Sequence, residues 1–254
     1  MCLIIFSYKN HPKYKLILAS NRDEFYDRPA SALSWWDGEK KVLAGKDKQS
    51  DGTWLGITPD LRLAAITNYR DLKNIKENAP SRGLLVRNFL ESDETPLQYL
   101  NNIKEKGAKY NGFNLIVGNE SGLYYYSNVS NKIEKIEAGL HGLSNKFLNT
   151  PWPKVEKGKN ELEKIIKQKE PSVNEILDLL GDTSRPPDNQ LPDTGVGLDL
   201  ERVLSPIFIK SEVYGTRASS IILIDNEDKV TFIEKSYIKN STGGFEKNTQ
   251  IIHF

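Results

Sequence analysis

The residue whose chemistry stands out is Cys2, the only cysteine of the 254-residue chain, which directly follows the initiator methionine. Aminopeptidases remove methionine readily when the next residue is as small as cysteine, so we expect loss of Met1 to expose Cys2 as the amino terminus. Such a cysteine combines a thiol nucleophile of pKa about 8.5 with an α-amino base of pKa about 8. These groups suffice for acyl transfer without a histidine. The alternative is that Cys2 is a buried core residue at the start of a strand.

The tetrad Asn21-Arg22-Asp23-Glu24 is a second candidate group, because it follows an expected strand over residues 15–20 that can pair with residues 2–8. This pairing places the tetrad at a strand end, beside the new amino terminus. An arginine there favours the thiolate and lowers the pKa of Cys2, and a carboxylate there can hold the α-ammonium group. The alternative is a solvated turn whose charges pair with one another and stabilise the fold little.

Composition argues against several other kinds of chemistry. A single cysteine and three scattered histidines, His11, His141 and His253, form no metal-binding motif, and the glycine-rich pieces lack the strand-to-helix context of a phosphate-binding loop. We therefore expect no metal and no cofactor. A net charge of +1 without a long basic block argues against nucleic acid as a partner.

Hydropathy indicates a protein without a membrane span. No apolar stretch reaches the 18 or more residues that a span requires, and the apolar run from Cys2 to Phe6 is too short for a signal peptide. We therefore expect a cytoplasmic location.

The elements that must position these residues are short strands and amphipathic helices. Strands are expected at residues 2–8, 15–20, 42–45, 53–58, 62–67, 114–117, 123–127, 132–137, 219–224 and 229–234. Apolar stripes of helical spacing predict helices that start at Ser81, Thr95 and Ser172, and one over residues 154–167. Gly181 is expected to end the last helix in a left-handed conformation. This order predicts one α+β domain over residues 1–254.

Residues 182–199 are rich in proline and show no apolar period, which indicates a long loop. Loops of this length in compact proteins often cover a site, so we expect a flap over the Cys2 end of the sheets. It should be ordered around residues 192–195 and near Asn145 or Arg217, with Asp193 bonded to a backbone amide or an arginine. The alternative is a mobile surface excursion.

A set of short blocks in fixed order connects the chain to a known family. The blocks are MC at 1–2, NRDE at 21–24, AGKD at 44–47, GTWLG at 52–56, TNYR at 67–70, GLSN at 142–145, LPDTGVG at 191–197 and YGTR at 214–217. Together they resemble the signature of the NRDE family, whose eukaryotic members are called transport and Golgi organisation protein 2. That family is similar to the N-terminal-nucleophile cysteine amidases, such as penicillin V acylase and conjugated bile acid hydrolase.

The resemblance implies a four-layer αββα sandwich, two antiparallel sheets between outer helices. It also implies a catalytic set, namely Cys2, Arg22, Asp23, Asn68, Asn145 and Arg217. Within this set, Asn145 is the expected donor to the oxyanion, and Asn68 is either a second donor or a holder of the α-amino group. The resemblance leaves open whether Asp23 or Glu24 faces that amine.

Two functions follow as hypotheses from this resemblance. The first is a cofactor-independent hydrolase of linear amides, in which Cys2 attacks a small-molecule acyl substrate and its own α-amine moves the proton. The second is a non-catalytic protein that handles an apolar ligand such as a lipid or haem during trafficking. A reactive amino-terminal cysteine favours the first, whereas saturable ligand binding without turnover favours the second.

Overall fold

Two antiparallel sheets form the framework, and each belongs to its own compact unit of the chain. The structure is a computed structural model that describes residues 2–38, 41–71, 74–240 and 244–254. One unit, called here the six-stranded unit, contains the chain up to Asp27, Ala138–Ser144 and Leu148–Phe254. The seven-stranded unit contains Arg28–Glu137 and Asn145–Phe147. Each unit is therefore assembled from segments that are distant in sequence.

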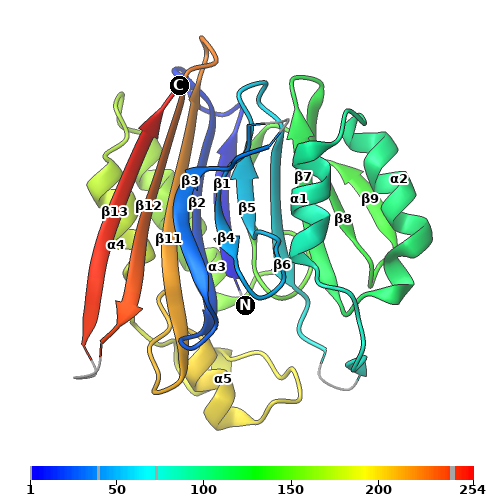
Figure 1. Cartoon of the computed structure of the whole chain (residues 1–254). Helices are drawn as coiled ribbons and strands as arrows, with labels where there is room; N and C mark the ends of the chain where they lie inside the picture. Colours follow the sequence, from blue (N-terminus) through cyan, green and yellow to red (C-terminus); the bar gives the residue numbers. More distant parts are fainter. Residues whose placement is uncertain (1, 39–40, 72–73, 241–243) are drawn as a thin grey trace. The chain divides into compact units, whose positions relative to one another are not determined.

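The six-stranded unit has the strand order β10-β1-β2-β11-β12-β13 (Figure 1). Its strands are β1 (Cys2–Tyr8), β2 (Tyr14–Phe25), β10 (Gly139–Leu143), β11 (Tyr214–Asp225), β12 (Val230–Lys239) and β13 (Phe245–His253). Its helices are α3 (Pro153–Ile166), α4 (Val173–Leu180), the 3-10 turn η3 (Asp188–Gln190) and α5 (Leu198–Leu204). The central pair joins β2 to β11 along their whole lengths, from Tyr214 opposite Phe25 to Asp225 opposite Tyr14.

Helices α3 and α4 pack on one face of this sheet. Side chains alternate between the two faces of a strand, so every second residue of β1 and β2 points toward these helices. Leu3 and Ile5 of β1 and Ala19 of β2 pack with apolar residues of these helices in one buried core. The contact is close: a Cβ atom on Gly158 of α3 would lie 1.8 Å from the Ile5 Cδ1 atom. Burial of each such leucine or isoleucine contributes about 1.5–3 kcal/mol. Cys2, at the alternate position, lies on the face away from these helices.

The seven-stranded unit is a meander whose strands pair in sequence order from β3 to β9. They are β3 (Ala30–Trp35), β4 (Leu43–Asp47), β5 (Leu55–Ile57), β6 (Leu63–Asn68), β7 (Phe113–Asn119), β8 (Gly122–Ser127) and β9 (Lys132–Lys135). Helices α1 (Gly83–Glu91) and α2 (Pro96–Lys106), which the 3-10 turn η2 (Gly107–Lys109) follows, pack on this sheet around a second core. Each unit therefore supplies one sheet with helices on it.

The capping residues in the sequence correctly predicted where two helices begin. Thr95 and Gln98 form the reciprocal capping box of α2, and the Ser172 hydroxyl accepts a hydrogen bond of 3.3 Å from the Glu175 backbone at the start of α4. Two expectations were wrong. The N-cap of α1 is Arg82 and has no side-chain cap, and Gly181 has φ −85°, which is right-handed rather than left-handed. Gly181 instead ends α4 by donating its backbone N–H to carbonyls of the last helical turn.

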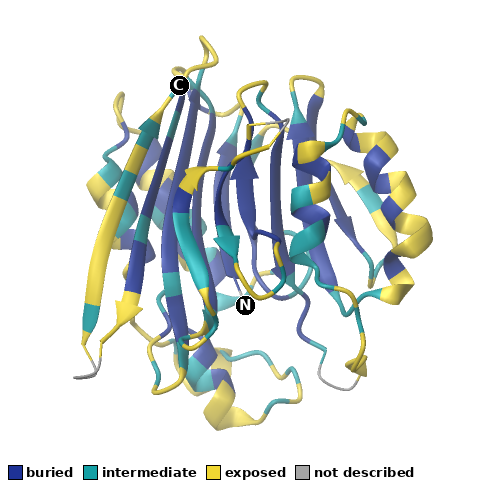
Figure 2. Ribbon diagram, in the orientation of Figure 1, coloured by how far each residue is buried: buried dark blue, intermediate teal, exposed yellow. Residues whose placement is uncertain are grey.

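The α+β class with two antiparallel sheets is confirmed, but three strands were not anticipated: β3, β10 and β13. Strand β13 shows why, because most of its residues are exposed and it lacks the alternation that signals a half-buried strand (Figure 2). Strand β10 has the sequence GLHGL, whose two glycines weaken any strand signal. Both strands are specified by pairing with a neighbour, β12 and β1 respectively.

Candidate active site

Cys2 begins β1 and lies directly opposite Arg22 of β2, which in turn lies opposite Ala218 of β11. Residues that pair directly share a face, so the Cys2 and Arg22 side chains lie together on the face away from α3 and α4. Both are buried, at 9% and 5% exposure. The Cys2 carbonyl accepts a hydrogen bond of 3.4 Å from the Ser144 hydroxyl, which follows β10. The first residue of β1 is thus fixed by β2 on one side and by the residue after β10 on the other.

The tetrad is part of a strand, not a turn after one, because β2 continues through it to Phe25. Its polar side chains are accommodated by partners from distant segments. Asn21 is fully buried: its amide donates to the carbonyls of Leu180 at 2.8 Å and Ile207 at 2.9 Å, and its oxygen accepts from the Ser219 hydroxyl at 2.6 Å. Asn21 therefore fastens both ends of the Gly181–Pro206 segment to β2.

Asp23 lies on the helix side of β2 and is 1% exposed. Its Oδ1 atom accepts a hydrogen bond of 2.7 Å from the Thr216 hydroxyl, and Thr216 also accepts from the Ile209 backbone at 2.9 Å. Burial raises the pKa of Asp23, while the positive charge of Lys154 and the Thr216 hydrogen bond act in the opposite direction. Asp23 is thus the buried acid of the tetrad.

Glu24 has a different environment from Asp23. It is partly exposed, and its carboxylate accepts a hydrogen bond of 2.9 Å from the backbone of Phe25. By strand alternation it lies on the opposite face of β2 from Asp23. Asp23 is therefore the acid that is bonded to another strand of the sheet, and which of the two acids faces the α-amino group stays a prediction.

Arg217 occupies an irregular position between two strands. The register shifts between Thr216, opposite Asp23, and Ala218, opposite Arg22, so Arg217 is the extra residue of a β-bulge. Its guanidinium donates a hydrogen bond of 2.8 Å to the Phe25 carbonyl. Partial burial and the nearby charge of Arg22 lower the pKa of Arg217. The bulge thus brings a second arginine into the electrostatic environment of the tetrad.

The pKa of the Cys2 thiol is raised in the full-length chain, chiefly by burial. The charges of the amino terminus and of Arg22 oppose the rise without overcoming it, and the Asp23 charge adds to it. Desolvation of the thiolate thus outweighs the neighbouring cations. The depressed pKa expected for Cys2 as the free amino terminus stays a prediction.

Iodoacetamide is accordingly expected to alkylate Cys2 of the full-length chain more slowly than free cysteine near pH 7, with a rate that rises as pH increases. Arg22→Ala should slow alkylation further, since Arg22 lowers the pKa of the thiol. Arg217→Ala is the matched control, because Arg217 lies in the bulge and donates to the Phe25 carbonyl, whereas Arg22 is the residue directly opposite Cys2. Rates measured from pH 6 to 10 test this, and a neutral-pH rate equal to that of free cysteine contradicts it.

Asn68 and Asn145 both belong to the seven-stranded unit, where the structure brings them together. The Asn145 amide donates a hydrogen bond of 2.9 Å to the Asn68 carbonyl at the end of β6, and the Asn145 carbonyl accepts from the Arg70 backbone at 2.8 Å. Asn145 is fully buried. Asn114 of β7 donates to the Lys146 carbonyl at 2.7 Å and thereby holds the next residue. The short segment Asn145–Phe147 is thus fixed to β6 and β7.

The six expected site residues therefore fall into two groups. Cys2, Arg22, Asp23 and Arg217 come together in the six-stranded unit, and the two asparagines come together in the seven-stranded unit. The chain passes from one unit to the other at the peptide bond between Ser144 and Asn145.

The segment expected to be a flap is ordered by its own contacts. The Asp193 carboxylate accepts a hydrogen bond of 3.0 Å from the Gly195 backbone, which confirms one of the two roles expected for it. Thr194 donates through its backbone to the buried Glu201 carboxylate at 2.9 Å. The segment is less irregular than expected, because it contains η3 and the start of α5. Its position over Cys2 stays a prediction.

Sequence reasoning assigned no role to four buried polar residues around this site: Asn21, Thr216, Lys154 and Glu234. Glu234 of β12 is 1% exposed and lies in the cross-strand row of Ser20 and Ser220, on the same face as Cys2. Asn21 and Thr216 do lie within the recognised NRDE and YGTR blocks, which was a usable signal. Lys154 and Glu234 sit among other charged residues and carry no local signal.

The described residues contain neither a metal-binding cluster nor a membrane-spanning helix. Over residues 2–38, 41–71, 74–240 and 244–254, no cluster of three or more His, Cys, Asp or Glu side chains could hold a metal ion. In the same part of the chain, no helix is long and apolar enough to cross a membrane.

The fold is similar to that of the Caenorhabditis elegans ortholog of N-acylethanolamine-hydrolyzing acid amidase, with a TM-score of 0.53 and 10% sequence identity. The similarity covers 87% of this chain and 92% of that chain. The chain thus has the fold of an N-terminal-nucleophile hydrolase.

Sequence comparison identifies the family. A family model described as Transport and Golgi organisation 2 matches residues 1–239. The chain is 37% identical over 274 residues to the Transport and Golgi organization protein 2 homolog of Bos taurus, and 35% identical over 271 residues to that of Homo sapiens. Each alignment covers 98% of both chains. The chain belongs to the Transport and Golgi organisation 2 family.

Proposed function

We propose that the protein hydrolyses a linear amide bond of an acylated small molecule, with Cys2 as the nucleophile after loss of Met1. Met1 lies outside the described residues, so its removal belongs to the proposal. The observation that carries it is the pairing of Cys2 with Arg22 at the first residue of β1, in a chain with an amidase-like fold. Asp23, buried and bonded to Thr216, is the carboxylate proposed to hold the α-ammonium group.

The proposed reaction proceeds through a thioester. The Cys2 sulfur attacks the substrate carbonyl, and its proton passes through the α-amine to the leaving nitrogen as the C–N bond breaks. Water then attacks the thioester, which releases the carboxylic acid and returns the proton to the sulfur. Neither step requires an oxidant, a reductant or a cofactor.

We assign the oxyanion to Asn145, with Asn68 as its support. The Asn145 amide donates to the Asn68 carbonyl, which fixes its orientation, and an asparagine NH₂ group is a donor suited to the oxygen of a tetrahedral intermediate. Such a donor is worth about 3–4 kcal/mol in the transition state. The assignment follows the catalytic set that the resemblance to the N-terminal-nucleophile amidases implies.

A screen of acyl donors tests the proposal. N-acyl amides, acylated amino acids and acyl thioesters are offered to wild-type, Cys2→Ala and Asp193→Ala proteins, together with binding assays for haem and a fatty-acyl ligand. We expect hydrolysis that Cys2→Ala abolishes and Asp193→Ala merely weakens, because Asp193 orders the flap segment rather than reacting. Ligand binding that is indifferent to Cys2, with no turnover of any donor, would instead support the handling of an apolar ligand in trafficking.

A further inference from the structure

Lys154 is a buried cation beside the proposed site that has no role in the reaction written above. It is the second residue of α3 and is 5% exposed. Its ammonium group donates a hydrogen bond of 3.0 Å to the Leu204 carbonyl, at the end of α5. Burial of an ammonium group is costly unless an opposite charge compensates it. Its position therefore calls for a nearby carboxylate.

Asp23 is a buried carboxylate on the same side of the sheet. It lies on the sheet face that carries α3, it is buried like Lys154, and the positive charge of Lys154 lowers its pKa. The chain after Leu204 also runs along the tetrad, because Asn21 binds the Ile207 carbonyl and Thr216 binds both the Ile209 backbone and Asp23. Lys154 thus lies where α3, the end of α5 and the tetrad strand meet.

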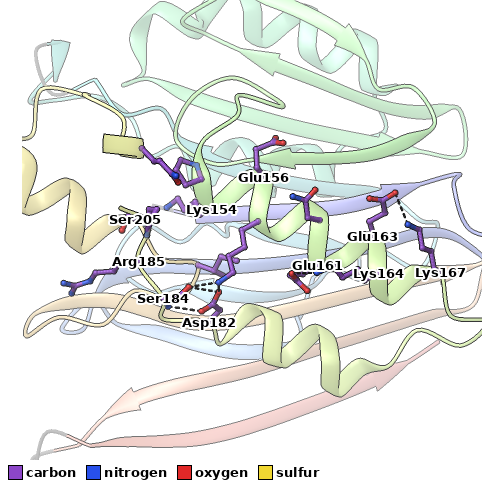
Figure 3. Close-up of a pocket in the computed structure, with 16 residues that line it drawn as sticks. Lys154, Glu156, Glu161, Glu163, Lys164, Lys167, Asp182, Ser184, Arg185 and Ser205 are labelled. Atoms are coloured by element: carbon purple, nitrogen blue, oxygen red, sulfur yellow. Dashed lines mark hydrogen bonds and ion pairs between the residues drawn. The ribbon is translucent and has the colours of Figure 1, made fainter. Parts of the chain in front are cut away.

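Lys154 also borders an open groove on the outer side of this junction. The groove has a volume of about 710 Å³ and is lined by α3 and residues 182–190, with Ser205 and Ile207 at one end. Figure 3 shows Lys154 next to Ser205, the residue after its hydrogen-bond partner. Three other lysines of the groove form ion pairs, Lys157 with Asp182, Lys164 with Glu161 and Lys167 with Glu163. Lys154 differs from them because it is buried.

We propose that Lys154 is a positioning residue that favours the ionised form of Asp23 by its charge, and that ties the end of α5 to the tetrad. Its catalytic consequence rests on the proposed function, because an ionised Asp23 is what holds the α-ammonium group of Cys2. The charge interaction between Lys154 and Asp23 can be tested whether or not the protein hydrolyses a substrate.

Other charged and titratable groups also affect the pKa of Asp23. The amino terminus favours the charged carboxylate and Glu24 disfavours it. The Asp23 charge in turn raises the pKa of the Cys2 thiol and of the Tyr26 hydroxyl. Lys154 is the side-chain cation that α3 contributes to this set.

Titration of the Asp23 carboxyl group by carbon NMR is the direct test. The signal is assigned by its absence in Asp23→Asn, and the full chain is compared as wild type, Lys154→Met and Lys154→Arg. We expect the midpoint to move to higher pH in Lys154→Met and to return toward the wild-type value in Lys154→Arg. One common midpoint for all three proteins overturns the proposal.

Unfolding measurements provide the second test. Because burial raises the pKa of folded Asp23, ionisation of Asp23 weakens folding as pH rises through that value, and loss of Lys154 increases this penalty. Lys154→Met should therefore lower the denaturant midpoint at a pH above the Asp23 midpoint measured by NMR, but much less at acid pH, where Asp23 is protonated in both states. In an Asp23→Asn background the drop at the higher pH should shrink by at least about half, since the partner charge is gone.

A merely structural Lys154, which only binds the Leu204 carbonyl, gives the same drop at every pH and in both backgrounds, and that result overturns the proposal. If Lys154→Met alone fails to fold, the Lys154→Met/Asp23→Asn double variant decides: folding of the double variant supports the charge interaction, and its failure refutes it. Neither test uses turnover, so absence of hydrolysis would count against the proposed function alone.

Discussion

Protein that begins at Cys2 is expected to hydrolyse its acyl substrate about 10²–10⁴-fold faster than a chain in which one residue precedes Cys2, because only the free α-amine can act as the base. In the longer chain that nitrogen is part of a peptide bond and no longer basic. The sulfur atom is the same in both proteins, so the difference isolates the base. Both forms can be released from a cleavable amino-terminal tag, starting at Cys2 or at an alanine placed before it.

Intact mass confirms which terminus each preparation carries, and Cys2→Ala released in the same way is the control without a nucleophile. Equal rates for the two cysteine-containing forms would exclude the α-amine as the base. Retention of Met1 by protein made in cells with ample aminopeptidase would count equally against the proposal, since the terminus that the mechanism requires would not form.

Asn21→Ala is expected to lower the free energy of unfolding by roughly 3–5 kcal/mol, a large part of the total of a typical domain. The substitution leaves the Leu180 and Ile207 carbonyls and the Ser219 hydroxyl without their present partner in a fully buried location. Each buried group that loses its hydrogen bond costs about 1–3 kcal/mol. Denaturant unfolding followed by circular dichroism measures the difference.

The matched control is Asn226→Ala. Asn226 also donates a side-chain hydrogen bond to a backbone carbonyl, that of Pro12 at 2.7 Å, but it does so at an exposed position where water can replace it. We expect Asn226→Ala to cost less than about 1 kcal/mol. A similar loss for both variants would mean that burial of the Asn21 contacts contributes nothing particular.

Sequence by itself determined the features that depend on local chemistry. The only thiol stands at position 2 whatever the fold, and the helix starts at Thr95 and Ser172 depend on hydrogen bonds within four residues. The ordered signature blocks identified the family and, through it, the fold class. They also located Asn21 and Thr216 within recognised segments, although without roles.

Only the tertiary structure decided how the charged tetrad is used. Asp23, rather than Glu24, is buried because β2 pairs through Phe25 with a strand about 190 residues further along the chain. Burial also raises the pKa of the Cys2 thiol in the full-length chain. Asn21, Lys154 and Glu234 gain their significance from partners on other strands and helices. Desolvation and cross-strand contacts depend on which distant segments surround a group, and no short window of sequence contains that information.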